Sequence, residues 1–155
     1  MLCESRKGGA RLVAARDFFK SIMTTAMRED ELLTEVRLPI LSKDTYAGFA
    51  EFSRRGGDYG IAMAVATYRL KGGIMSDMRI AVGGAEAAPR RVTEAERTLI
   101  GRPPNLGAFQ AAGHAAAKAM DPLEDDTVSA EYRLGIVRTM VTRALQNANP
   151  AGQDA

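Results

Sequence analysis

Two neighbouring segments with strand periodicity constrain the fold of this 155-residue chain most strongly. Residues 61–70 alternate large apolar side chains with alanines, so both faces of such a strand would be apolar. In residues 74–83, the apolar side chains of Ile74, Met78, Ile80 and Val82 alternate with polar ones, which is typical of a half-exposed strand. Only Lys71-Gly72-Gly73 separates the two segments, and this predicts a tight turn with antiparallel pairing. We expect the first strand to be covered on both faces, with a helix packed closely on its alanines.

Another aromatic-rich strand is expected before this pair, over residues 46–54, and three helical segments come after it. The helices are expected at about 93–100, 106–120 and 129–147, with Thr93, Asn105 and Ser129 as their N-caps. Strands grouped before helices favour an α+β fold over βαβ crossovers. We therefore predict a three- to four-stranded antiparallel sheet with three helices packed on one face.

Residues 1–41 form a separate region in this interpretation. Residues 10–14 indicate a short strand, residues 15–19 a helical turn, and residues 31–40 a strand that Pro39 ends. These elements are too short to bury their own side chains, so we expect exposed apolar residues at Phe18, Phe19, Ile22 and Leu32. The chain then divides into residues 1–41, a domain at 42–148, and a disordered tail at 149–155.

Composition excludes several classes of protein. With one cysteine and one histidine, the chain cannot form an internal disulfide, a zinc centre or an iron–sulfur cluster of its own. A net charge of +2 without a basic run does not indicate nucleic-acid binding. No segment approaches the roughly 20 apolar residues of a membrane span, and the N-terminus does not resemble a signal peptide. We expect a reducing, cytoplasmic compartment, no metal ligands, and no role for Cys3.

Four local features have structural as well as functional interpretations. His114 is either a packed or surface helix residue, or a catalytic base without a local acid. Residues 28–31 and 124–126 are acidic segments that we interpret as solvated turns, since they lack calcium-loop spacing. Gly83-Gly84 either ends a strand or cradles a phosphate, although no GxGxxG or Walker pattern is present.

Arg133 falls within the apolar arc of the last expected helix. A buried guanidinium requires a carboxylate or backbone carbonyls as partners. Arg133 is therefore either a structural clamp or a residue that faces a partner subunit.

The segment Phe52-Ser53-Arg54-Arg55-Gly56-Gly57-Asp58-Tyr59 stands between two expected strands. It is either an ordinary turn with solvated charges or a binding site for a planar, polar ring. In the second case the tyrosine would stack on the ring while the charges met its edge.

A series of short segments runs in order along nearly the whole chain. They are residues 14–19, 31–39, 49–59, 79–84, 89–91, 95–96, Leu99, Gly101 and 129–133. Together these segments resemble the FAD-binding (medium) subunit of the molybdenum hydroxylases, the family of carbon monoxide dehydrogenase and xanthine dehydrogenase. The resemblance implies that residues 42–148 are the family's C-terminal flavoprotein domain, an α+β sandwich, and that residues 1–41 are the end of its FAD-binding domain.

The resemblance also implies an electron-transfer role as a subunit of an FAD-dependent oxidoreductase. In this family, electrons pass from a substrate oxidised at molybdopterin, through 2Fe-2S clusters, to FAD and then to an acceptor. The partners would be an iron–sulfur small subunit and a molybdopterin large subunit in a hetero-oligomer. The family's two glycine-rich FAD loops lie upstream of anything in this sequence, so we expect a C-terminal fragment or the product of a late start codon. We expect the chain to be inactive in isolation.

The segment that matches residues 54–59 lies beside the isoalloxazine ring in such proteins. By resemblance, Tyr59 would cover one ring face, and Asp58 and Arg55 would set the polarity near its edge. Gly57 belongs to the same expected cofactor-binding segment. Leu38 matches a stretch that also runs near the flavin. No residue of the chain is expected to be catalytic, because the chemistry belongs to the cofactors. The alternatives are a non-catalytic module that docks to the other subunits without flavin, and an unrelated small α+β binding domain.

Overall fold

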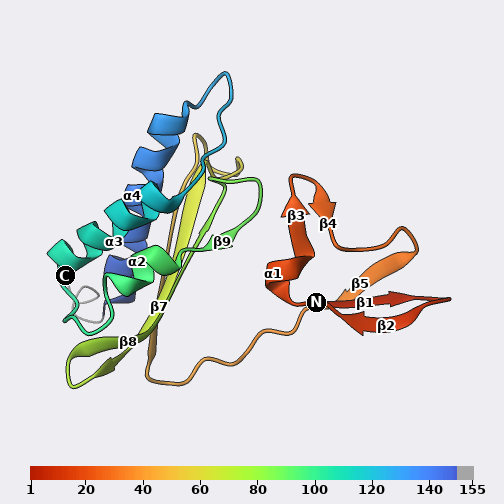
Figure 1. The fold of residues 1–155 in the computed structure, drawn as a ribbon, viewed down its shortest axis with the longest axis horizontal. Helices are drawn as coiled ribbons and strands as arrows, with labels where there is room; N and C mark the ends of the chain where they lie inside the picture. Colours follow the sequence, from red (N-terminus) through yellow and green to blue (C-terminus); the bar gives the residue numbers. More distant parts are fainter. Residues whose placement is uncertain (150–155) are drawn as a thin grey trace. The chain divides into compact units, whose positions relative to one another are not determined.

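The computed structural model describes residues 1–149 and divides the chain into two compact units, Met1–Leu41 and the part that begins at Ser42 (Figure 1). The boundary agrees with the division expected after residue 41. Of the tail expected at 149–155, only Asn149 lies within the described residues. None of the helices within residues 1–149 is long and apolar enough to cross a membrane.

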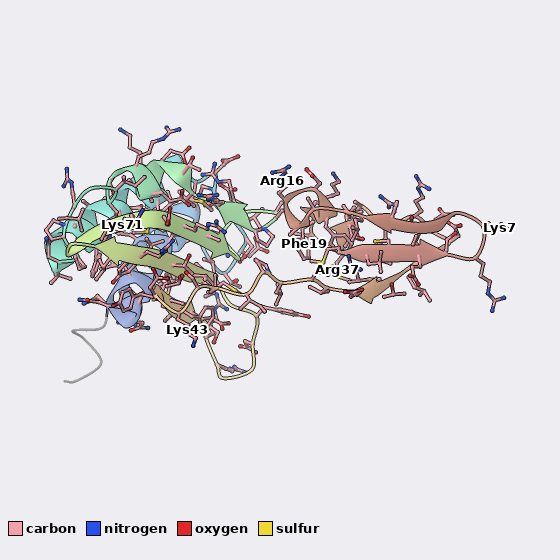
Figure 2. All side chains as sticks on the ribbon, turned by 90° about the horizontal axis from the view of Figure 1, so that it is seen from below. Lys7, Arg16, Phe19, Arg37, Lys43 and Lys71 are labelled. Carbon is pink, nitrogen blue, oxygen red and sulfur yellow. The ribbon has the colours of Figure 1, made fainter. Side chains whose placement is uncertain are left out.

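The first unit is built from five short strands and one helical turn. Its elements are β1 (Leu2–Ser5), β2 (Gly9–Leu12), α1 (Ala15–Phe18), β3 (Phe19–Ser21), β4 (Thr24–Thr25) and β5 (Glu31–Glu35). The strand order β2-β1-β5 gives an antiparallel sheet, and β3 pairs with β4. Lys7 lies at the tip of the β1–β2 hairpin (Figure 2).

The last strand of this unit is shorter than the sequence predicted. The period-2 pattern indicated a strand over residues 31–40, but β5 ends at Glu35. Its partner β1 begins at Leu2, which stands opposite Glu35, and the ladder between the two strands ends at this pair. The following residues therefore expose their side chains, with Leu38 81% and Ile40 99% exposed.

Two expectations for the first unit were wrong. Phe18 is buried, and its ring packs edge-on against Phe19 at 5.2 Å, although Phe19, Ile22 and Leu32 are exposed as expected. The acidic segment at residues 28–31 is not simply a solvated turn, because Glu31 is only 7% exposed. Its carboxylate accepts hydrogen bonds from Arg11 at 2.6 and 2.7 Å. A buried carboxylate requires such a partner, and Arg11 is 20 residues away in the sequence.

The second unit contains the predicted antiparallel sheet. Its strands are β6 (Thr45–Phe52), β7 (Ala62–Lys71), β8 (Ile74–Gly83) and β9 (Arg90–Arg91), in that spatial order. β7 and β8 are antiparallel neighbours, as predicted. Gly72 and Gly73 join them with φ of 59° and 80°, a left-handed conformation that favours glycine.

Three helices cover one face of this sheet (Figure 1). They are α2 (Thr93–Arg97), α3 (Leu106–Ala119) and α4 (Ala130–Ala148). α4 packs on β6 and β7, α2 packs against β8, and α3 packs on α2 and α4. The alanines of β7 lie fully buried beneath the helices, as their small size predicted. The α+β fold prediction is confirmed.

The tightest contact between helix and sheet is at Gly48 of β6. A Cβ atom at this position would lie 2.1 Å from the carbonyl oxygen of Ala144 and 2.5 Å from the amide nitrogen of Ala148. Gly113 plays the same role between α3 and α4, where a Cβ would lie 2.5 Å from the carbonyl oxygen of Arg138. These glycines set how closely the layers approach each other.

Three local predictions for this unit were wrong. Asn105 and Ser129 do cap α3 and α4, but Thr93 is the first residue of α2 rather than its cap. In β8 the ladder register shifts and Asp77 adopts a φ of 50°, so Met75 rather than Ile74 shares the buried face with Met78. On the face of β7 opposite the helices, Val65 is 45% exposed, so within this unit only one face of the strand is covered.

Candidate functional site

The loop at residues 53–60, between β6 and β7, holds four of the five expected cofactor-binding residues. The amide of Ile61 donates to the carbonyl of Phe52 at 2.8 Å and closes the base of the loop. Within the loop, the amide of Asp58 donates to the carbonyl of Arg55 at 3.1 Å. Gly57 has a φ of 91°, which favours glycine at this turn. The loop is therefore an ordered turn that backbone hydrogen bonds close at its base.

A second loop, between α3 and α4, lies against the first. The side chain of Arg54 donates to the carbonyl of Thr127 at 2.7 Å, which joins the two loops across 73 residues of sequence. Asp125 orders this second loop by accepting hydrogen bonds from the amides of Thr127 and Val128 at 2.8 and 3.0 Å. These bonds and the hydroxyl of Thr127 lower the pKa of the Asp125 carboxyl, and the nearby positive charge of Arg133 adds to the effect.

Arg133 connects these segments from the first turns of α4, and its side chain is only 7% exposed. Its Nε donates to the carbonyl of Leu123 at 2.7 Å, and Nη1 donates to the carbonyls of Ile61 and Gly84 at 3.0 Å each. Its Nη2 binds the carboxylate of Asp125 at 2.9 Å. Of the two interpretations left open for Arg133, the structural clamp is confirmed.

The glycine pair at the end of β8 belongs to the same junction. Gly84 has a φ of 78°, and a Cβ atom there would lie 2.6 Å from the carbonyl oxygen of Gly60. The pair therefore lets the end of β8 approach the loop closely enough for Arg133 to bind both segments. This contact favours the first interpretation of Gly83-Gly84, in which the pair ends a strand of the sheet.

A pocket of about 410 Å³ opens between the two loops. Its lining includes Arg54, Asp58, Tyr59, Asp125 and Arg133. The side chain of Tyr59 is 99% exposed, so its aromatic ring is free to contact a ligand. An unburied aromatic ring beside acidic and guanidinium groups suits a flat ligand with polar edges. The residues present therefore fit the ring portion of a flavin.

The remaining candidates are not among the residues that line this pocket. Arg55 belongs to the loop but not to the lining, and Leu38 belongs to the first unit. His114 is exposed on α3 and lines a different groove. Within residues 1–149, no three His, Cys, Asp or Glu side chains are grouped closely enough to hold a metal ion.

Sequence reasoning missed Asp125, which was assigned to a solvated acidic turn at residues 124–126, and it did not single out Thr127. Asp125 orders its own loop and also binds Arg133, so the segment is part of the site's framework. The Asp-x-Thr spacing could have indicated this, because an aspartate often caps the amide two residues later. The long-range bond from Arg54 to the Thr127 carbonyl leaves no comparable signal in the sequence.

Comparison with known proteins finds relatives of this chain in sequence and in structure. Residues 47–148 match the family described as CO dehydrogenase flavoprotein C-terminal domain. The nicotine 6-hydroxylase medium subunit of Paenarthrobacter nicotinovorans is 37% identical over 140 residues, which cover 90% of this chain and 49% of that protein. The chain therefore spans about half the length of the curated relatives it matches.

Solved structures give the same result. A chain of carbon monoxide dehydrogenase from Hydrogenophaga pseudoflava, in a form that lacks the Mo-pyranopterin moiety, superposes with a TM-score of 0.86 at 32% identity. The match covers 95% of this chain and 51% of that one. A chain of quinoline 2-oxidoreductase from Pseudomonas putida 86 superposes with a TM-score of 0.90 at 29% identity, over 98% and 53% of the two chains. On the match over residues 47–148 and these similarities, the chain belongs to the CO dehydrogenase flavoprotein C-terminal domain family.

Proposed function

We propose that this chain provides the C-terminal part of a flavin-binding subunit in a molybdenum hydroxylase. In that role the subunit holds an FAD that receives electrons from iron–sulfur clusters and passes them to an acceptor. Its partners would be an iron–sulfur small subunit and a molybdopterin large subunit. Family membership supports this proposal, as does the similarity to medium subunits of multi-subunit oxidoreductases. The single cysteine, which cannot form an internal disulfide, supports a reducing, cytoplasmic location.

The observation that carries the proposal is the full exposure of Tyr59 beside a pocket whose walls are held in place. Arg54 and Arg133 hold the two loops together, so the backbone that carries Tyr59 is in place without a ligand. A loop with an ordered backbone loses less conformational freedom when a planar ligand stacks on its aromatic ring. Such a loop is therefore suited to binding an isoalloxazine ring.

Each residue of the loop has a distinct task in this proposal. Tyr59 would cover one face of the isoalloxazine, while Arg55 and Asp58 would contact or polarise its edge. Gly57 would allow the turn that places them, and Leu38 would contribute an apolar contact to the flavin. When bound, FAD supplies the capacity to take up and release electrons, and the protein contributes binding and electrostatic tuning.

The alternative of an interaction module without flavin has less support. The matching family is defined as a flavoprotein domain. We therefore retain the flavin-holding role as the proposed function.

The test uses the assembled enzyme that contains this chain, with Tyr59→Ala compared with Tyr59→Phe. We expect Tyr59→Ala to lower the flavin retained after gel filtration or to expose the flavin to a fluorescence quencher. Tyr59→Phe should behave like the unaltered protein, because it keeps the ring. Phe49→Ala is a matched control, since Phe49 is a half-exposed aromatic residue on the sheet of the same unit. An assembly that contains no flavin, or one in which Tyr59→Ala changes nothing, would contradict the proposal.

A further inference from the structure

Two grooves run along the exposed side of α4, away from the pocket at Tyr59. The first, of about 560 Å³, has an apolar floor of Phe52, Ile136 and Met140 and a wall formed by Tyr132. The second, of about 440 Å³, lies between α3 and α4 and is lined by polar residues that include His114 and Gln146. Arg138, Thr139 and Arg143 line both grooves, so the two form one continuous surface along the helix. We call this surface the α4 face.

The charge of the α4 face is unbalanced. Arg138 and Arg143 are exposed, and neither makes a side-chain ion pair or hydrogen bond to the residues that the structure describes. Glu131, at the first turn of the helix, is the only acidic residue that lines either groove. The face therefore offers two unpaired guanidinium groups beside an apolar floor.

Gly135 provides an independent observation. Glycine inside a helix costs about 1 kcal/mol relative to alanine, so it usually has a steric reason. Gly48 and Gly113 have such a reason, because a neighbouring backbone lies within 3 Å of their missing Cβ. Around Gly135, a Cβ would meet no atom within 4 Å. Gly135 lines the apolar groove, so the space left by its missing side chain opens towards whatever occupies that groove.

We propose that the α4 face binds an acidic polypeptide segment of a partner subunit, with an apolar side chain between its carboxylates. The apolar side chain would enter the groove beside Gly135 and Tyr132, and the carboxylates would pair with Arg138 and Arg143. Arginine suits this task because its planar fork binds a carboxylate through two hydrogen bonds. Exposed tyrosine and arginine are also enriched where protein interfaces concentrate their binding energy.

This inference rests on the proposed assembly with other subunits but not on the flavin. The experiment is therefore made in the assembled enzyme with Arg138→Glu, Arg143→Glu and the double variant. We expect the affinity of the chain for its partners to fall on the order of tenfold per reversed charge, while the flavin content of any assembled enzyme stays normal. Arg97→Glu is the control, because Arg97 is exposed on α2 and lines neither groove.

A second measurement identifies the occupant. A photo-crosslinking residue at Gly135 should capture a partner peptide that contains Asp or Glu, whereas the same residue at the exposed Ala111 of α3 should not. Normal assembly of the double variant, or capture of a second copy of this chain or of a peptide without acidic residues, would overturn the inference and leave the proposed function intact. Failure of the unaltered chain to assemble with any partner would overturn both.

Discussion

The guanidinium of Arg133 binds the carboxylate of Asp125 at 2.9 Å and, through the same planar group, the backbone of two other segments. One side chain on α4 thereby fixes the end of β8, the start of β7 and the loop before α4. Because Asp125 in turn orders the backbone that Arg54 binds, Arg133 supports the loop of Tyr59 without contacting Tyr59 itself.

Replacement of Arg133 by methionine should destabilise the second unit strongly. The carbonyls of Leu123, Ile61 and Gly84 would lose their partner, and an unsatisfied buried polar group costs about 1–3 kcal/mol. Some of this loss is relieved by water, so we expect the free energy of unfolding to fall by about 3 kcal/mol. Urea denaturation followed by far-ultraviolet circular dichroism measures this, because α3 and α4 dominate the signal. Arg97→Met should stay within about 0.5 kcal/mol of the unaltered protein, and an equal loss in both variants would contradict the clamp.

Gly48→Ala should separate α4 from the sheet. The added methyl group would lie 2.1 Å from the carbonyl oxygen of Ala144, and only a shift of backbone could relieve that overlap. We expect a loss of about 1–3 kcal/mol or more, measured by the same denaturation. Gly56→Ala is the matched control, because a Cβ there meets nothing within 4 Å and the residue does not have a positive φ. Similar stability of the Gly48→Ala and Gly56→Ala variants would contradict the close contact between α4 and β6.

The first unit should lose stability in acid through Glu31. The hydrogen bond from Arg11, followed by that from the backbone of Arg28, lowers the pKa of Glu31 from 4.5 to about 2. A carboxyl whose pKa is lower in the folded state stabilises that state fully above its unfolded pKa. This contribution is lost as pH falls from about 4.5 towards 2. Amide hydrogen exchange in β1 and β5 should show the loss, and Glu31→Gln should remove it, whereas Glu29→Gln should not.

Exposed apolar side chains of the first unit should promote association. Ile22, Met23, Leu38 and Ile40 are each at least 65% exposed. Apolar side chains exposed in such numbers favour association or binding to another surface. We expect the 155-residue chain to self-associate at micromolar concentration and to bind an apolar fluorescent dye. Sedimentation should shift towards the monomer when Leu38 and Ile40 are both replaced by aspartate, and a clean monomer without dye binding would contradict this prediction.

The 155-residue chain by itself should purify colourless and bind added FAD weakly. Much of the binding of a dinucleotide comes from its pyrophosphate, held by backbone amides of glycine-rich loops, and the sequence contains no GxGxxG or Walker pattern. Stacking on Tyr59 contributes about 1 kcal/mol, less than the 1.4 kcal/mol of a tenfold change in affinity. One or two hydrogen bonds to charged groups add roughly 1.5–3 kcal/mol each, most of which the ordering cost of association offsets. Visible absorbance after gel filtration tests this, and a tightly bound flavin would show that the binding determinants lie elsewhere.

The kind and order of the elements in the second unit could be predicted from the residue pattern alone. The pairing of β7 with β8, the caps at Asn105 and Ser129, and the helices over the alanines of β7 all follow from side-chain period and short-range turn chemistry. These signals are local, so one sequence is enough to read them. The resemblance to flavin subunits was carried by the order of the segments and is confirmed by the family match.

The features that depend on contacts between distant residues could be identified only in the folded structure. The bulge in β8 changed which residues face the core, and no local pattern marks it. The partner of Glu31 is 20 residues away, and the carbonyls that Arg133 binds come from three separate segments. The sequence indicated that a buried Arg133 needs partners but not which ones, because backbone carbonyls are present at every residue. Their arrangement around one guanidinium arises only when the sheet and the helices pack together.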